Sequence, residues 1–295
     1  MKLGLMVIPP LDIKSLARKV RRLRLEAIEL ALPISLEPLT REYRRHITEL
    51  TGTVDVVFSF HQPLLNILSN TDAAMRRRVM DAMREQIDFV ASLGGGIITV
   101  HSAITRTIRP RAKHWRNPAT RWFVEVLDTK LTTDYDTTVE DTAAALAELG
   151  DFAAPRGVRL ALENNFRDEV FFGARIDSFR EVRDIVARVG RENVGLCLDV
   201  FKAYSTGEAF PESIAAAAGR LINVHISDIS DTNNAWAPRR GAVGSGLVAW
   251  EGVFRALSEL RYDGAFHLEM IREDHEQDSS CAFIRGILER LERRI

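Results

Sequence analysis

The sequence has few cysteines, no excess charge of either sign and no long apolar run. Only Cys197 and Cys281 occur in 295 residues, which provides no disulfide framework and suits the reducing cytoplasm. The net charge is −1, with 40 basic and 41 acidic residues, so the overall charge does not call for a polyanionic partner. No apolar run reaches the roughly 18 residues of a membrane span. The first apolar run is too short for a signal peptide and ends at Pro9-Pro10, so we interpret it as a strand.

Apolar residues make up 46% of the chain, and short apolar runs alternate with segments of helical length. The predicted strands are Leu3–Ile8, Ala27–Leu32, Val54–Phe60, Gly96–His101, Arg159–Glu163, Val194–Val200, Leu221–Ile226 and Gly264–Met270. The predicted helices are Asp12–Leu25, Glu37–Leu50, Thr71–Leu93, Thr137–Ala154, Asp177–Val189, Pro211–Gly219, Val248–Leu260 and Gln277–Arg294. Nearly continuous apolar strands are typical of parallel sheets that are covered on both faces. Eight strand–helix units in a row therefore predict an α/β fold, a (β/α)8 barrel, as one domain over residues 1–295.

Four residues with metal-ligand side chains each end a short apolar run in the second half of the chain. They are Glu163 in LALE, Asp199 in VGLCLD, His225 in LINVH and Glu269 in GAFHLE. The carboxyl ends of barrel strands meet at one face, where active sites lie. Three carboxylates and one imidazole suit a divalent ion with open positions for substrate oxygens. The pattern predicts a metal site at that mouth, although any single one of the four could instead be a helix cap or an ion-pair partner.

Four motifs follow one another here: LALEN, LCLDV, NVHISD and GSGLVAWEGVFRALSELRYDGAFHLE. Their order resembles the xylose isomerase-like barrel superfamily, which includes sugar and sugar-phosphate isomerases and epimerases and the endonuclease IV type of AP endonuclease. The most specific part is Gly244–Glu269, with its Gly-x-Gly, its tryptophan six residues after the first glycine, and YDG before the final glutamate.

The resemblance implies a Mn²⁺, Mg²⁺, Co²⁺ or Zn²⁺ ion held by Glu163, Asp199, His225 and Glu269. In the epimerases it further implies that the two glutamates move protons. An ion chelated by a ketose carbonyl and the adjacent hydroxyl lowers the pKa of the intervening C–H and stabilises an enediolate. A carboxylate on each side can then remove and return a proton. We therefore expect a metal-dependent isomerase or epimerase of a small carbohydrate or sugar phosphate, with Glu163 and Glu269 as its catalytic residues.

Two histidines, His61 in FSFHQP and His101 in ITVHSA, end predicted strands on the same face. In the endonuclease IV pattern the matching histidines bind a second metal that shares the first glutamate, here Glu163. The alternatives are that they line the pocket and hydrogen-bond sugar hydroxyls, or that they are structural.

The chain departs from the endonuclease IV pattern at the third metal. Lys202 replaces a histidine three residues after the strand-six aspartate, and Pro238 and Arg240 replace an Asp-x-His. A trinuclear phosphodiesterase is therefore disfavoured. Lys202 as a point charge and Arg240 as a bidentate fork could hold a phosphate or carboxylate of the substrate. They could equally lie on a solvated rim.

Asn165 and Asp228 are further candidates for contact with the substrate or for support of the ligands. No spacing rule separates these two roles. A long insertion, Ser102–Leu131, interrupts the alternation after the fourth strand and is basic between Arg106 and Arg121. A loop of this length is typical of a lid over a site or of a subunit contact.

The predicted partner is a small sugar or sugar phosphate, in a cytoplasmic protein that could form a homo-oligomer. The alternative function is a binuclear zinc phosphodiesterase of the endonuclease IV type that acts on abasic DNA. Nucleic acid is the less favoured partner, because a surface that tracks phosphates usually leaves an excess of lysine and arginine.

Overall fold

Eight parallel strands close into a barrel in the computed structural model, which describes residues 1–9, 12–62, 65, 68, 72–103, 134–165, 176–231 and 239–293. The barrel strands are β1 Lys2–Val7, β2 Ala27–Ala31, β3 Val57–Gln62, β4 Gly96–His101, β5 Val158–Glu163, β6 Val194–Asp199, β7 Leu221–Ile226 and β10 Ala265–Leu268. Each pairs with its neighbours in chain order, and β1 pairs with β10 to close the ring. The predicted barrel is confirmed. Its extent as one domain over residues 1–295 stays a prediction, and the basic insertion lies almost wholly in residues 104–133, outside the described part.

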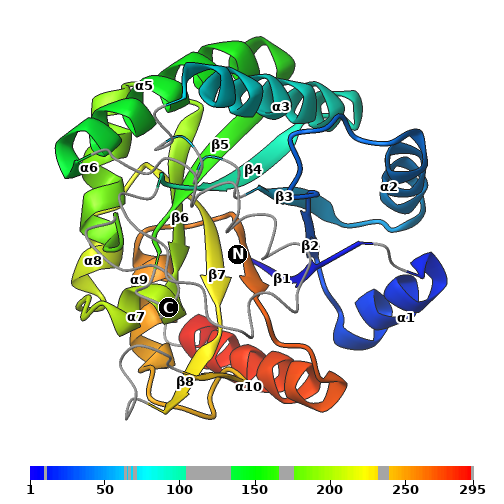
Figure 1. Cartoon of the computed structure of the whole chain (residues 1–295). Helices are drawn as coiled ribbons and strands as arrows, with labels where there is room; N and C mark the ends of the chain where they lie inside the picture. The colour runs from blue at the N-terminus through cyan, green and yellow to red at the C-terminus, as the bar shows by residue number, and fades with distance from the viewer. Residues whose placement is uncertain are drawn as a thin grey trace.

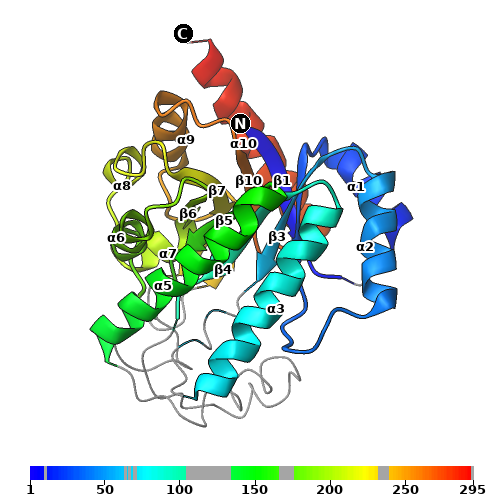
Figure 2. The ribbon, with the colours of Figure 1, turned by 90° about the horizontal axis from the view of Figure 1, so that it is seen from above.

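Helices surround the barrel, as Figure 1 shows. They are α1 Ile13–Leu23, α2 Arg41–Thr53, α3 Ala73–Ser92, α5 Tyr135–Ala153, α6 Phe179–Val189, α7 Val200–Ser205, α8 Glu212–Ala215, α9 Trp250–Glu259 and α10 Asp274–Glu292. Seen from above, α3 and α5 lie side by side along one flank (Figure 2). None of the helices within the described ranges is long and apolar enough to cross a membrane.

Local signals set several helix ends. Ser178 begins α6 with a capping box, in which its hydroxyl accepts from the Glu181 N–H and the Glu181 carboxylate accepts from the Ser178 N–H. Gly190 ends α6 at a φ of 63°, a conformation that glycine adopts without strain. Both helix ends agree with the prediction for this segment. Thr40 caps α2, which begins at Arg41, four residues after the start of the predicted helix Glu37–Leu50.

Other predicted bounds were wrong in ways that matter near the mouth. Strand β3 was expected at Val54–Phe60 but runs Val57–Gln62, because α2 continues to Thr53 and residues 54–56 connect the helix to the strand. His61 therefore lies within the strand. The predicted helix Pro211–Gly219 is only the single turn α8. The sequence did not predict α7 or the two-stranded hairpin of β8 Asp228–Asp231 and β9 Arg239–Gly241.

The two faces of the barrel strands differ in polarity. Outward-facing residues such as Leu160 and Leu162 are fully buried beneath the helices. The lumen instead holds polar side chains that hydrogen-bond one another. Glu29 Oε1 accepts from Thr99 Oγ1 at 2.9 Å and from Asn223 Nδ2 at 2.8 Å. Because buried polar groups need partners, this network ties three strands together below the mouth.

Candidate metal centre

Parallel register brings the predicted ligands to one end of the barrel. Strand β5 ends at Glu163, which lies beside His101 of β4. Strand β6 ends at Asp199, which lies beside His225 of β7. Glu269 follows β10 directly, and its N–H donates to Ile226 O of β7 at 3.1 Å. These side chains therefore share the carboxyl-terminal face where barrel active sites lie.

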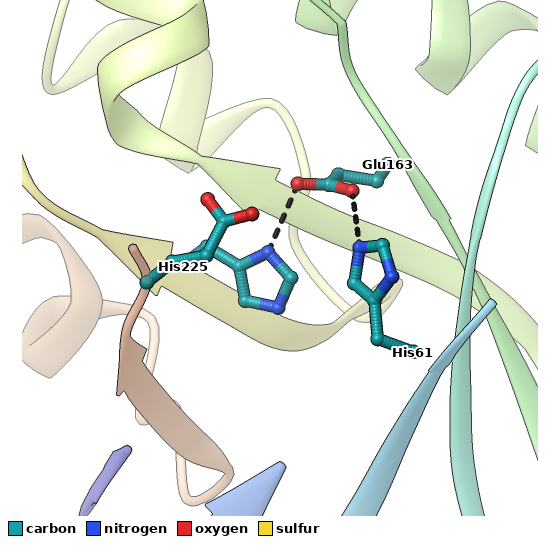
Figure 3. A group of neighbouring side chains, drawn as sticks. His61, Glu163 and His225 are labelled. Carbon is teal, nitrogen blue, oxygen red and sulfur yellow. Dashed lines mark hydrogen bonds and ion pairs between the residues drawn. The ribbon is translucent and has the colours of Figure 1, made fainter. Parts of the chain in front are cut away.

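Glu163 is the hub of this cluster and is fully buried. Its Oε1 lies 2.9 Å from His225 Nδ1 and 2.5 Å from Lys202 Nζ. Its Oε2 lies 3.1 Å from His61 Nε2 and 2.6 Å from His101 Nε2. Figure 3 shows the carboxylate between the rings of His61 and His225. One carboxylate thus faces two different sets of partners.

The donor set suits a divalent ion. His61, Glu163, His225 and Glu269 are all buried, and each offers a ligand atom within 4.8 Å of the other three. Two imidazoles and two carboxylates that converge in this way are a set that borderline ions such as Zn²⁺ and Mn²⁺ accept. The structure brings together three of the four predicted ligands, with His61 as the fourth member.

Asp199 lies beside this group rather than in it. Its Oδ2 is 3.2 Å from Lys202 Nζ and 3.0 Å from Arg240 Nη2. The other guanidinium nitrogen, Nη1, is 2.8 Å from Glu269 Oε2. Lys202 and Arg240 therefore lie against the carboxylates of the site. That Asp199 joins the metal ligands, and that the two cations also hold a substrate anion, stay predictions.

These cations control the charge of the carboxylates. Burial raises the pKa of Glu163, but the Lys202 ammonium and neighbouring imidazoles outweigh it, and the pKa lies well below its ordinary value. Arg240 and Lys202 outweigh burial at Glu269 in the same way and lower its pKa. At Asp199 burial prevails and raises the pKa to about 6. Both glutamates are therefore ionised at neutral pH, the state in which a carboxylate binds a metal ion or accepts a proton.

Glu29 is a site residue that the sequence analysis missed. It is fully buried on β2, and its Oε2 lies 2.6 Å from His225 Nε2. Burial would raise its pKa, but His225 outweighs burial and lowers the pKa to about 2. Because Glu29 is ionised, it keeps a proton on Nε2 of His225, so an ion would bind at Nδ1 and displace the proton that faces Glu163 Oε1. Metal-binding histidines commonly donate their other N–H to a carboxylate in this way.

The two further candidates take different positions. Asn165 Nδ2 donates to Ser102 Oγ at 3.2 Å. Asp228 accepts four N–H donors, from the backbone of Ile229, Val248 and Gly244 and from Trp250 Nε1. Its carboxylate therefore organises the loop before α9. Their contact with substrate stays a prediction.

Asn164, which follows the predicted ligand Glu163 in the chain, joins the ends of two barrel strands. Its Nδ2 donates to Asp199 O at 3.1 Å, and its Oδ1 accepts from Asp199 N at 2.9 Å. Asn164 thus fixes the end of β6 against the end of β5, where two of the predicted ligands stand.

Replacement of Glu29 by glutamine is expected to weaken divalent-metal binding about 10- to 100-fold, the usual effect of losing a carboxylate behind a ligand histidine. Titration of metal-free protein with Zn²⁺ or Mn²⁺ in a calorimeter measures this. Glu49→Gln, an exposed change on α2, is the control and should bind as the wild type does. Unchanged affinity in Glu29→Gln would show that the Glu29–His225 contact does not serve the metal.

Comparison with known proteins places these observations in a family. Inosose isomerase from Bacillus velezensis is 32% identical over 142 residues, which are 46% of this chain and 48% of that protein. A probable endonuclease 4 from Mycobacterium leprae is 24% identical over 194 residues, 64% of this chain and 63% of that protein. The chain thus spans about half the length of the isomerase that it matches.

Solved structures share the whole fold. A crystal structure of a D-tagatose 3-epimerase-like protein has a TM-score of 0.72 at 19% identity and covers 100% of this chain and 99% of its own. A structure of IOLI protein with a binding zinc atom has a TM-score of 0.70 at 18% identity, with coverage of 98% and 96%. At such identities the likeness is one of fold. Residues 17–287 also match the family described as xylose isomerase-like TIM barrel, and the chain therefore belongs to this family, as the motifs predicted.

Proposed function

We propose that this chain is a divalent-metal-dependent isomerase or epimerase of a small carbohydrate or sugar phosphate. The observation that carries the proposal is the buried group of His61, Glu163, His225 and Glu269, whose ligand atoms lie within 4.8 Å of one another. Two glutamates in one such group can serve both as ligands and as bases. The names of the relatives, inosose isomerase and D-tagatose 3-epimerase-like protein, support a polyhydroxy ketone as substrate.

The roles of the residues follow from their positions. A divalent ion held by Glu163, His225 and Glu269 would supply Lewis-acid polarisation of a substrate carbonyl. An ionised glutamate takes the proton from the carbon beside that carbonyl; the electron pair of the C–H bond forms a C=C bond, and the π pair of the carbonyl moves onto its oxygen. Return of a proton to the opposite face of the same carbon gives an epimer. Return to the former carbonyl carbon gives an isomer when the hydroxyl proton of the neighbouring carbon passes to the former carbonyl oxygen, which leaves the new carbonyl on that neighbour. Glu163 and Glu269 come from β5 and from the end of β10, so they approach a ligand at the mouth from different strands.

A second candidate is a binuclear phosphodiesterase. It is favoured by the placement of His61 and His101 on the same oxygen of Glu163, at 3.1 and 2.6 Å, and by the endonuclease 4 relative. It is disfavoured by the two fixed cations, Lys202 and Arg240, which already neutralise carboxylates of the site.

The test is proton exchange. Metal-free protein is loaded in turn with Mn²⁺, Mg²⁺, Co²⁺ and Zn²⁺ in D₂O and mixed with ketoses, ketose phosphates and keto-inositols. We expect NMR to show deuterium incorporation beside the carbonyl of at least one substrate class, dependent on the added ion, followed by isomerised product. The absence of exchange across the panel, together with cleavage of an abasic-site DNA duplex, would favour the phosphodiesterase instead.

A further inference from the structure

Lys202 places a buried ammonium group inside the candidate metal centre. The residue lies in the first turn of α7, where its backbone N–H donates to Asp199 Oδ1 at 3.1 Å. Its side chain is only 3% exposed, and its Nζ contacts Glu163 Oε1 at 2.5 Å and Asp199 Oδ2 at 3.2 Å. A buried charge persists only when it is paired. Lys202 is thus a fixed positive charge between two carboxylates of the site.

The other oxygen of Glu163 faces a separate set of ligand-type atoms. His61 Nε2 and His101 Nε2 lie 3.1 and 2.6 Å from Oε2, and their rings meet edge to face with centroids 4.9 Å apart. Two imidazoles and a carboxylate oxygen would supply three of the four ligands of a typical Zn²⁺ site. The Oε2 side of Glu163 therefore has the composition of a second ion site, which would take His61 from the group of four and leave the first ion to Glu163, His225 and Glu269.

Charge balance allows one divalent ion but opposes two. Four carboxylates are buried in and below the centre within the described part of the chain: Glu29, Glu163, Asp199 and Glu269. The fixed cations Lys202 and Arg240 pair with three of them. Because a histidine binds an ion as a neutral imidazole, two negative charges remain when the ligands are ready for metal, and one divalent ion cancels them. A second ion would leave two positive charges in a buried site, which is strongly unfavourable at low dielectric.

Of the two cations, Lys202 has the more direct effect on how many ions the centre binds. Arg240 pairs with Asp199 and Glu269, whereas Lys202 contacts Glu163, the carboxylate that both ion sites would share. We propose that Lys202 limits the centre to one divalent ion, and that a neutral side chain at this position opens the His61–His101–Glu163 set to a second. This inference rests on the proposed function, because it takes one ion at Glu163, His225 and Glu269 as given.

The test counts ions. The full chain is stripped with a chelator, titrated with Zn²⁺ in a calorimeter, and analysed for bound metal after gel filtration. We expect one ion in the wild type and two in Lys202→Gln, with the second ion bound at least about 100-fold more tightly than by the wild type. The double variant Lys202→Gln/His101→Ala should return to one. Lys202→Arg keeps the charge and should also bind one.

A second readout uses Mn²⁺, because two ions that share a carboxylate show a spin-coupled resonance spectrum that one ion cannot give. If Lys202→Gln fails to fold by circular dichroism, Lys202→Met retains the apolar stem without the charge and carries the same expectation. If the wild type and the folded neutral variants each bind one ion, the inference about Lys202 is overturned but the proposed function is not. Two ions in the wild type would also overturn it, whereas no ion in the wild type would overturn the proposed function as well.

Discussion

Glu163→Gln is expected to lower kcat/KM for the proton transfer by at least about 10³-fold. A general base typically contributes about 10²–10⁴-fold, and loss of the carboxylate also removes a ligand charge. The amide can still accept hydrogen bonds, but it cannot take a proton from carbon. The measurement is the rate of deuterium incorporation into substrate with saturating metal, which reports the base directly.

Glu259→Gln is the matched control, because it makes the same change at an exposed position on α9. It should retain wild-type exchange. Thermal unfolding of both variants shows whether the protein still folds when Lys202 loses the Glu163 carboxylate, one of its two partners. A folded Glu163→Gln that exchanges deuterium at the wild-type rate would remove Glu163 from the proton transfer.

Asp228→Asn is expected to destabilise the protein by about 2–6 kcal/mol, because two buried N–H donors lose their acceptor. The Asp228 carboxylate accepts from Gly244 N at 2.9 Å and Trp250 Nε1 at 2.7 Å through one oxygen, and from Ile229 N and Val248 N through the other. The asparagine amide nitrogen would face two of these donors, and each buried unsatisfied donor costs about 1–3 kcal/mol. Urea unfolding measures the loss.

Asp55→Asn, at an exposed position before β3, is the comparison and should change stability little. The same loop depends on Gly246, where a Cβ would overlap the carbonyl oxygen of Ile229. Unchanged stability in Asp228→Asn would show that these hydrogen bonds do not stabilise the loop.

The alternation of short apolar runs with helix-length segments was enough to predict the barrel, and three of those strands end at the candidate site residues His101, Glu163 and Asp199. The side chains at strand ends meet in parallel register, so the proximity of Glu163 to His225 follows from topology. Glu29 could not be found in this way. It stands inside the apolar run AIELA, and only the closed barrel brings it against His225 of β7, five strands further along the chain.

Lys202 and Arg240 show a second limit of prediction from local sequence. Lys202 and Arg240 were recognised as charges near the mouth, but their partners depend on α7 and on the β8–β9 hairpin, which no periodic pattern marks. Asp199 illustrates the result. Its position at the end of β6 was predicted, whereas its contacts with Lys202 and Arg240 come from elements that pack only in three dimensions.

Pairing of β1 with β10 has a consequence for synthesis on the ribosome. The ring closes only when residues 265–268 insert between β1 and β7 and pair with both strands. Glu269 follows these residues directly. A nascent chain that lacks this segment cannot close the ring and lacks one of the four candidate ligands. We therefore expect the divalent ion to bind late in synthesis, after almost the whole barrel has emerged from the ribosome.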